Sequence, residues 1–114
     1  MPRSIHFRSL RRIFVGAAIA LLSACAPAYL APPVNPELVR KSPAPQTRLE
    51  SGHELYMQKC AKCHAFENPA NYGEDELKFD IMPVMARKSK LSERDADAVL
   101  AYLLAARKMP AVDR

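Results

Sequence analysis

The residues with the clearest chemistry form the run Cys60-Ala61-Lys62-Cys63-His64. Two thiols on one helical turn can add to the two vinyl groups along one edge of a porphyrin. A histidine directly after the second thiol is then carried under the iron. This C-x-x-C-H spacing is the attachment pattern of haem c. We therefore predict one covalent haem c, with thioether bonds to Cys60 and Cys63 and with His64 as an axial iron ligand.

Three other interpretations of this run have weaker support. A thioredoxin-like C-x-x-C follows a strand in a βαβ unit, and no segment of this chain alternates like a strand. A zinc site needs a second pair of ligands, but beyond the run the expected folded part offers His53 alone. A structural disulfide between Cys60 and Cys63 leaves His64 without a role. The haem interpretation accounts for all three residues.

The N-terminal residues predict export. Residues 1–12 are basic, residues 13–22 are apolar apart from Gly16, and two small residues follow. This order is typical of a secretory signal peptide. The apolar run is shorter than the roughly 20 residues that span a bilayer. We therefore expect residues 1–24 to be a cleaved signal peptide rather than a transmembrane anchor.

A lipid anchor is expected at Cys25. The run Leu22-Ser23-Ala24-Cys25 resembles the lipobox of bacterial lipoproteins, in which the cysteine is acylated and becomes the first residue. Several acyl chains hold a protein stably on a bilayer. Ala26 at the next position is similar to the outer-membrane sorting pattern. We expect a lipid-anchored protein of the bacterial cell envelope that faces the periplasm, on the outer membrane.

Residues 25–46 predict a linker. They contain six prolines and no glycine, and proline favours extended, semi-rigid chain. The segment is either a stalk that lifts a domain from the bilayer or a coat that wraps the domain. The sequence leaves both arrangements open.

The net charge excludes nucleic acid as a partner. The formal charge is +5, but four of the 17 basic residues lie in the signal peptide, which has no acidic residue. The remainder carries 13 basic against 12 acidic residues. Two haem propionates would bring its charge to about −1, which does not attract a polyanion.

Residues 47–110 predict one small all-α domain. Apolar spacing favours helices over about 48–59, 73–87 and 92–108, the second bent or broken at Pro83. Ser92 with Asp95 is a variant of the capping box that begins the third. Three short helices bury little apolar surface. We expect them to wrap around the haem, which then supplies much of the core.

The chain resembles the small monohaem c-type cytochromes of bacteria over residues 49–107. The likeness rests on Leu49, Gly52, Leu55 and Tyr56 leading into the C-x-x-C-H run, and on residues 91–103 as the last helix. The resemblance implies that Gly52 on the first helix packs against Tyr102 on the last.

The same resemblance places the second axial ligand, a methionine, between the C-x-x-C-H run and the last helix. Met82 and Met85 both lie there, and residues 81–91 are more similar to the subgroup in which Met85 is the ligand. A thioether closes the site and raises the potential, which suits electron transfer. Met57 and Met109 are expected to pack or face solvent. A five-coordinate iron, or one bound by His53, stays an alternative.

Other residues are expected around the haem in supporting roles. By resemblance, Pro69 presents its carbonyl to the far nitrogen of His64. The side chains expected to reach the haem propionates are Tyr72, Arg87 and Lys88. The lysines expected around the exposed haem edge, where they would steer an acidic partner, are Lys59, Lys62 and Lys78.

These features predict a membrane-tethered one-electron carrier rather than an enzyme, with redox proteins of the cell envelope as partners. One alternative is a haem relay subunit of a periplasmic redox enzyme. The other is a gas or redox sensor whose sixth position is open or labile.

Overall fold

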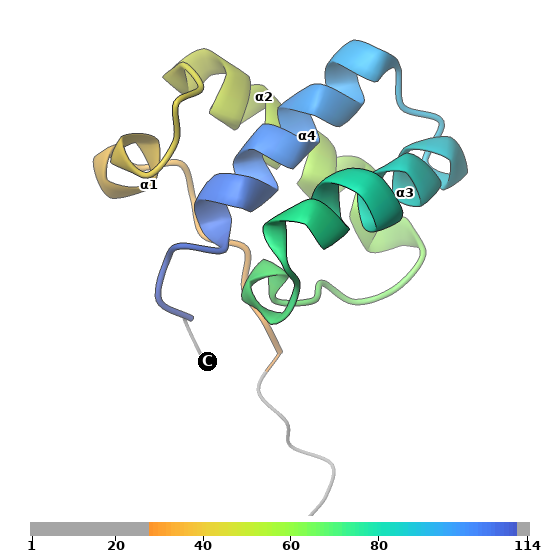
Figure 1. Cartoon of the computed structure of the whole chain (residues 1–114), viewed down its shortest axis with the longest axis horizontal. Helices are drawn as coiled ribbons and strands as arrows, with labels where there is room; N and C mark the ends of the chain where they lie inside the picture. Colours follow the sequence, from red (N-terminus) through yellow and green to blue (C-terminus); the bar gives the residue numbers. More distant parts are fainter. Residues whose placement is uncertain (1–27, 112–114) are drawn as a thin grey trace, which may run out of the picture.

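The computed structural model describes residues 28–111, so the expected signal peptide and Cys25 lie outside the described residues. Within that range the chain is all-α, as predicted (Figure 1). Four α-helices appear where three were expected. They are α1 (Pro36–Arg40), α2 (Gln46–Lys59), α3 (Met82–Lys88) and α4 (Glu93–Ala106). Short 3₁₀ turns η1 (Cys60–Lys62) and η2 (Pro69–Asn71) and a π-helix η3 (Glu76–Ile81) complete the fold.

Helices α2 and α4 pack on each other and form the frame of the domain. The Ser92 hydroxyl caps α4 by accepting a hydrogen bond from the Asp95 amide at 3.1 Å, which confirms the predicted start. Gly52 lies against α4, where a Cβ built on it would be 3.0 Å from the Cβ of Tyr102. The expected packing of Gly52 against Tyr102 is therefore confirmed.

The predicted helix over about 73–87 is present, but it changes its winding before Pro83. Proline has no N–H to donate, and its ring clashes with the carbonyl four residues back. The chain accommodates this with the wider turns of η3, in which the Met82 amide bonds to the carbonyl of Leu77, five residues earlier. The helix therefore widens ahead of the proline and continues as α3.

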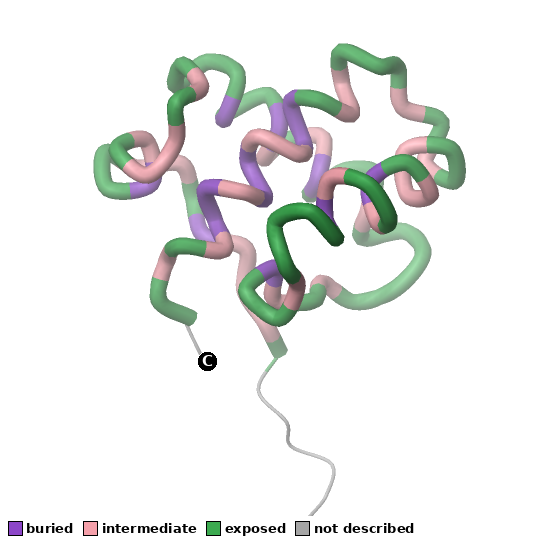
Figure 2. Tube along the Cα trace, viewed as in Figure 1, coloured by how far each residue is buried: buried purple, intermediate pink, exposed green. Residues whose placement is uncertain are grey.

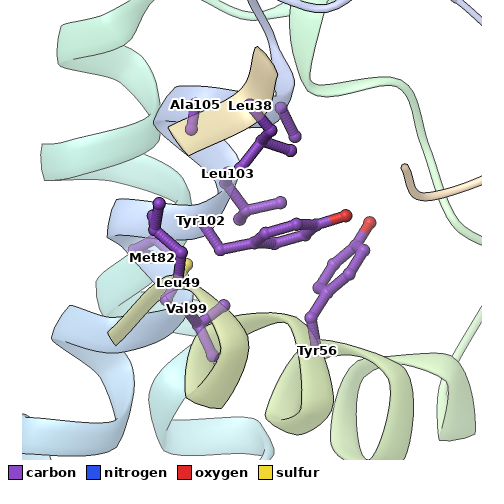
Figure 3. Close-up of a cluster of buried hydrophobic side chains, with 9 residues drawn as sticks. Leu38, Leu49, Tyr56, Met82, Val99, Tyr102, Leu103 and Ala105 are labelled. Atoms are coloured by element: carbon purple, nitrogen blue, oxygen red, sulfur yellow. The ribbon is translucent and has the colours of Figure 1, made fainter. Parts of the chain in front are cut away.

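The core lies between α2, α4 and the segment that contains α1 (Figures 2 and 3). Its largest fully buried side chains come from these three parts of the chain and are Leu38, Leu49, Val99 and Tyr102. Met82 enters the same cluster from α3. Burying apolar side chains of this size stabilises the fold by about 1.5–3 kcal/mol each.

Helix α1 was not expected and lies inside the predicted linker. Asn35 caps it by accepting from the Leu38 amide at 2.9 Å, and Pro36 takes the first turn, where its missing N–H costs nothing. Leu38 is completely buried. The packed body therefore begins before residue 47, and residues 29–44 follow the surface of the domain.

Candidate functional site

A cavity of about 280 Å³ lies between the C-x-x-C-H run and the helix that continues from η3 into α3. Cys60, Cys63 and His64 line it from one part of the chain, and Met82 and Met85 line it from the other. We call this cavity the crevice. All four predicted haem residues, and the alternative ligand Met82, therefore meet at one place.

The two cysteines are free thiols in different surroundings. Cys60 follows α2 directly and is half-buried, whereas Cys63 is exposed. Burial raises the pKa of the Cys60 thiol, the nearby Cys63 raises it further, and a hydrogen bond with the Ser89 hydroxyl opposes both. Ser89 caps the end of α3, so Cys60 lies next to the end of the helix that carries the methionines.

His64 is exposed, and its Nδ1 lies 2.7 Å from the carbonyl oxygen of Ala65. Donation from Nδ1–H to that carbonyl leaves Nε2 free to bind a metal. Pro69 was expected to supply this carbonyl. It is buried in the crevice wall instead, and its oxygen accepts from the Tyr72 amide at 3.3 Å. The orienting contact therefore comes from Ala65.

Only two of the candidate sixth ligands line the crevice. Met82 is 5% exposed and belongs to the core cluster, whereas Met85 is half-buried, and both line the crevice. Met57 is 43% exposed, and Met109 packs against the core elsewhere. His53 packs edge-on against Tyr102, with ring centroids 5.1 Å apart. Met57, Met109 and His53 do not line the crevice.

Apolar side chains form much of the crevice wall. Tyr56 and Leu103 contribute from α2 and α4, and Leu77 and Ile81 from η3. Tyr56 is held by Phe66, whose ring centroid lies 4.6 Å away. Tyr56 was not predicted as a site residue, although it stands four residues before Cys60 and so shares a helix face with it. No local signal pointed to Ser89 or Leu103.

The polar side chains at the crevice agree with the prediction in part. Tyr72 and Lys88 line it, as do the exposed carboxylates of Glu67 and Glu76, but Arg87 does not. The Tyr72 hydroxyl donates to Glu67. Among the lysines expected at the haem edge, Lys78 pairs with Glu74 at 2.5 Å; Lys59 and Lys62 are exposed.

These residues fit a covalently bound haem. Two neighbouring thiols, an imidazole and a thioether are the protein groups that haem c uses, and apolar walls suit a flat apolar macrocycle. Across residues 28–111 no three His, Cys, Asp or Glu side chains cluster so as to hold a metal ion. A haem needs only two ligands from the protein, because the porphyrin supplies the other four.

In the described part of the chain no helix has the length and apolar character required to cross a membrane. No family model, curated protein or solved structure matches this chain.

Proposed function

We propose that this chain is a small c-type cytochrome with one covalent haem c, which carries single electrons while tethered to a membrane. The observation that carries the proposal is the crevice, where Cys60, Cys63 and His64 meet two methionines within largely apolar walls. The residues of the C-x-x-C-H run are neighbours in the sequence, whereas the methionines come close to them only because the chain folds.

Each side chain has a distinct role in this proposal. The Cys60 and Cys63 thiols would hold the haem, and His64 would bind the iron through Nε2 while its Nδ1–H donates to the Ala65 carbonyl. Met85 would supply the second protein ligand to the iron, because it lines the crevice and, unlike Met82, does not belong to the core cluster. Bound haem c supplies a reversible one-electron couple, whose potential a methionine ligand raises.

Electron transfer is favoured over catalysis by the character of the wall that carries the methionines. Leu77 and Ile81 from η3 are apolar. The charged residues of the same wall, Glu76 and Lys88, are exposed, and the half-buried Ser89 lies next to Cys60. Catalysis at a haem uses polar groups close to an open iron position. A relay subunit of a redox enzyme would use the same residues in the same way.

The proposed location is the periplasmic side of the bacterial outer membrane, with Cys25 as the lipid-bearing residue. This part rests on the lipobox-like sequence. Replacing Cys25 with Ser is expected to leave haem content unchanged and to release the protein from membranes. If the Cys25→Ser protein still sediments with membranes after a salt wash, lipidation is not the anchor.

Covalent haem attachment is tested by exporting the chain in cells that contain the haem-attachment machinery. Mass spectrometry of the denatured protein is expected to show the mass of one added haem. Acid-acetone is expected to leave that haem on the protein, and Cys60→Ala and Cys63→Ala are each expected to remove one thioether bond. A haem that acid-acetone extracts from the wild type would contradict the proposal.

A further inference from the structure

The segment between the expected lipid anchor and α2 packs on the domain as a strap, which we define as residues 29–41. The buried Tyr102 hydroxyl donates to the carbonyl oxygen of Pro32 at 2.8 Å. Leu38 of α1 is completely buried in the core cluster that also contains Ala105 (Figure 3). At the end of the strap, the Lys108 ammonium donates to the carbonyl oxygen of Lys41 at 3.1 Å. The strap is therefore held on α4 and on the residues that directly follow it.

Packing already begins at Tyr29. Burial raises the pKa of its phenol to about 12. Three residues further on, the Pro32 carbonyl accepts the hydrogen bond from Tyr102, whose ring centroid lies 5.8 Å from that of Tyr56. Tyr29 raises the pKa of both phenols electrostatically, in agreement with this placement. Figure 3 shows the hydroxyls of Tyr56 and Tyr102 pointing to the same side of the core cluster. The chain thus joins the domain on that side.

The number of residues before this point limits how far the domain can lie from its anchor. Tyr29 follows Cys25 by four residues, and extended chain spans at most about 3.6 Å per residue, so the two are at most about 14 Å apart. A free stalk over residues 26–46 would instead reach roughly 60 Å. The strap replaces a long tether with a short one.

We propose that the strap holds the domain on the bilayer surface, with the side where the strap meets Tyr102, next to Tyr56, against the phospholipid headgroups. This inference rests on the lipid anchor at Cys25 in the proposed function. Tyr56 also lines the crevice, so the haem site is kept near the membrane. The partner class that fits is a redox protein bound to the same membrane.

The test compares two insertions of the same flexible Gly-Ser linker of about 15 residues, which spans roughly 20 Å. One lies between residues 27 and 28, before the strap. The matched insertion lies between Ser42 and Pro43, in the loop after the strap, where added length costs little. Each lipidated holoprotein is placed in phosphatidylethanolamine and phosphatidylglycerol vesicles that contain a headgroup-linked dye. Quenching of the dye by the haem reports its distance from the bilayer.

A docked strap predicts different outcomes for the two insertions. The insertion before residue 28 is expected to reduce quenching at least twofold, because it lengthens the free tether. The insertion after Ser42 is expected to leave quenching unchanged, because the strap contacts persist. An equal loss in both would show a free stalk and overturn the proposal. No loss in either would also overturn it, since the strap would then not set the distance.

Failure of the proposed function is recognised separately on the same samples. Mass spectrometry measures covalent haem, and vesicle flotation measures the anchor. Hydrogen exchange of the amides in α1 needs neither haem nor lipid, and protection approaching that of α2 is expected. Exchange in α1 as fast as in an unstructured peptide would show that the strap does not dock.

Discussion

Gly52 lies so close to α4 that a Cβ built on it would be 2.0 Å from the carbonyl oxygen of Ala98. No real Cβ approaches backbone so closely, and a backbone oxygen in the middle of α4 cannot rotate away as a side chain can. The absence of a side chain at this position is therefore what allows α2 and α4 to cross. This crossing fixes how α2 lies on α4, and with it the place of Cys60, which directly follows α2.

Replacing Gly52 with Ala is expected to destabilise the fold by about 3 kcal/mol or more, because the helices must separate. Urea unfolding of the holoprotein measures this loss, and haem yield on export should fall with it. Gly73→Ala is the matched control, since a Cβ there meets only the Glu76 Cβ at 3.8 Å. The control is expected to change stability by less than about 1 kcal/mol. Equal effects of the two substitutions would contradict the helix contact.

Met85→Ala is expected to open the sixth position of the iron. The weak red absorption band of methionine–iron ligation should disappear, the reduction potential should fall, and the ferrous protein should bind carbon monoxide. Met57→Ala is the control, because Met57 is exposed outside the crevice. Optical spectra in both oxidation states provide the measurement.

Met82→Ala is expected to act on stability instead. Met82 is 5% exposed within the core cluster, so its loss leaves a cavity that costs about 2–5 kcal/mol. The absorption band should survive in whatever protein folds. If Met82→Ala rather than Met85→Ala opens the iron, the ligand is Met82. If neither changes the spectrum, a sensor or another ligand replaces the electron-carrier mechanism.

Tyr102→Phe is expected to loosen the strap. The substitution keeps the ring but leaves the Pro32 carbonyl without its buried partner, at a cost of about 1–3 kcal/mol. Amides of α1 should exchange faster than in the wild type. Tyr72→Phe removes a hydroxyl that bonds to Glu67 in an exposed setting and should change stability by less than about 0.5 kcal/mol. If the α1 amides of the Tyr102→Phe protein exchange as slowly as those of the wild type, the hydrogen bond to Pro32 does not hold the strap.

Stability is expected to depend on pH through His53. Burial lowers the pKa of His53 from its ordinary value of 6.5, so the unfolded chain binds this proton more readily than the folded one. The contribution is present above pH 6.5 and is lost as pH falls through the lower folded pKa. His53→Gln should therefore flatten the difference in urea midpoint between about pH 7.5 and about pH 5. If the His53→Gln protein keeps the full difference in urea midpoint between the two pH values, other titratable groups cause the pH dependence.

Lys90→Gly is expected to stabilise the domain. Lys90 has a φ of 53° after the end of α3, and the Leu91 amide bonds to the carbonyl of Ala86 at 2.9 Å. This is a Schellman-type helix end, where glycine avoids a left-handed cost of about 1 kcal/mol. Lys88→Gly lies inside α3 and should destabilise by about 0.5–1 kcal/mol. Thermal unfolding compares the two, and a loss of stability in Lys90→Gly would contradict the argument.

The sequence by itself determined the features that depend on near neighbours. The C-x-x-C-H spacing predicts haem attachment at Cys60, Cys63 and His64, and all three residues line one crevice. The all-α character and the approximate helix limits followed from apolar spacing and from the Ser92 cap. Gly52 was expected against Tyr102 because residues 49–64 and 91–103 resemble the terminal helices of a known family. Covalent attachment, lipidation and electron transfer stay predictions.

Only the tertiary structure decided the arrangements that depend on distant partners. The five residues of α1 are too few to be helical alone; burial of Leu38 and the bond from Tyr102 to Pro32 stabilise the strap. Composition left a stalk and a coat both open, because the number of prolines does not show which residues the segment packs on. The unequal exposure of Met82 and Met85, and the contact of Ser89 with Cys60, likewise arise where separate helices meet. The spacing of neighbouring residues does not predict contacts between separate helices.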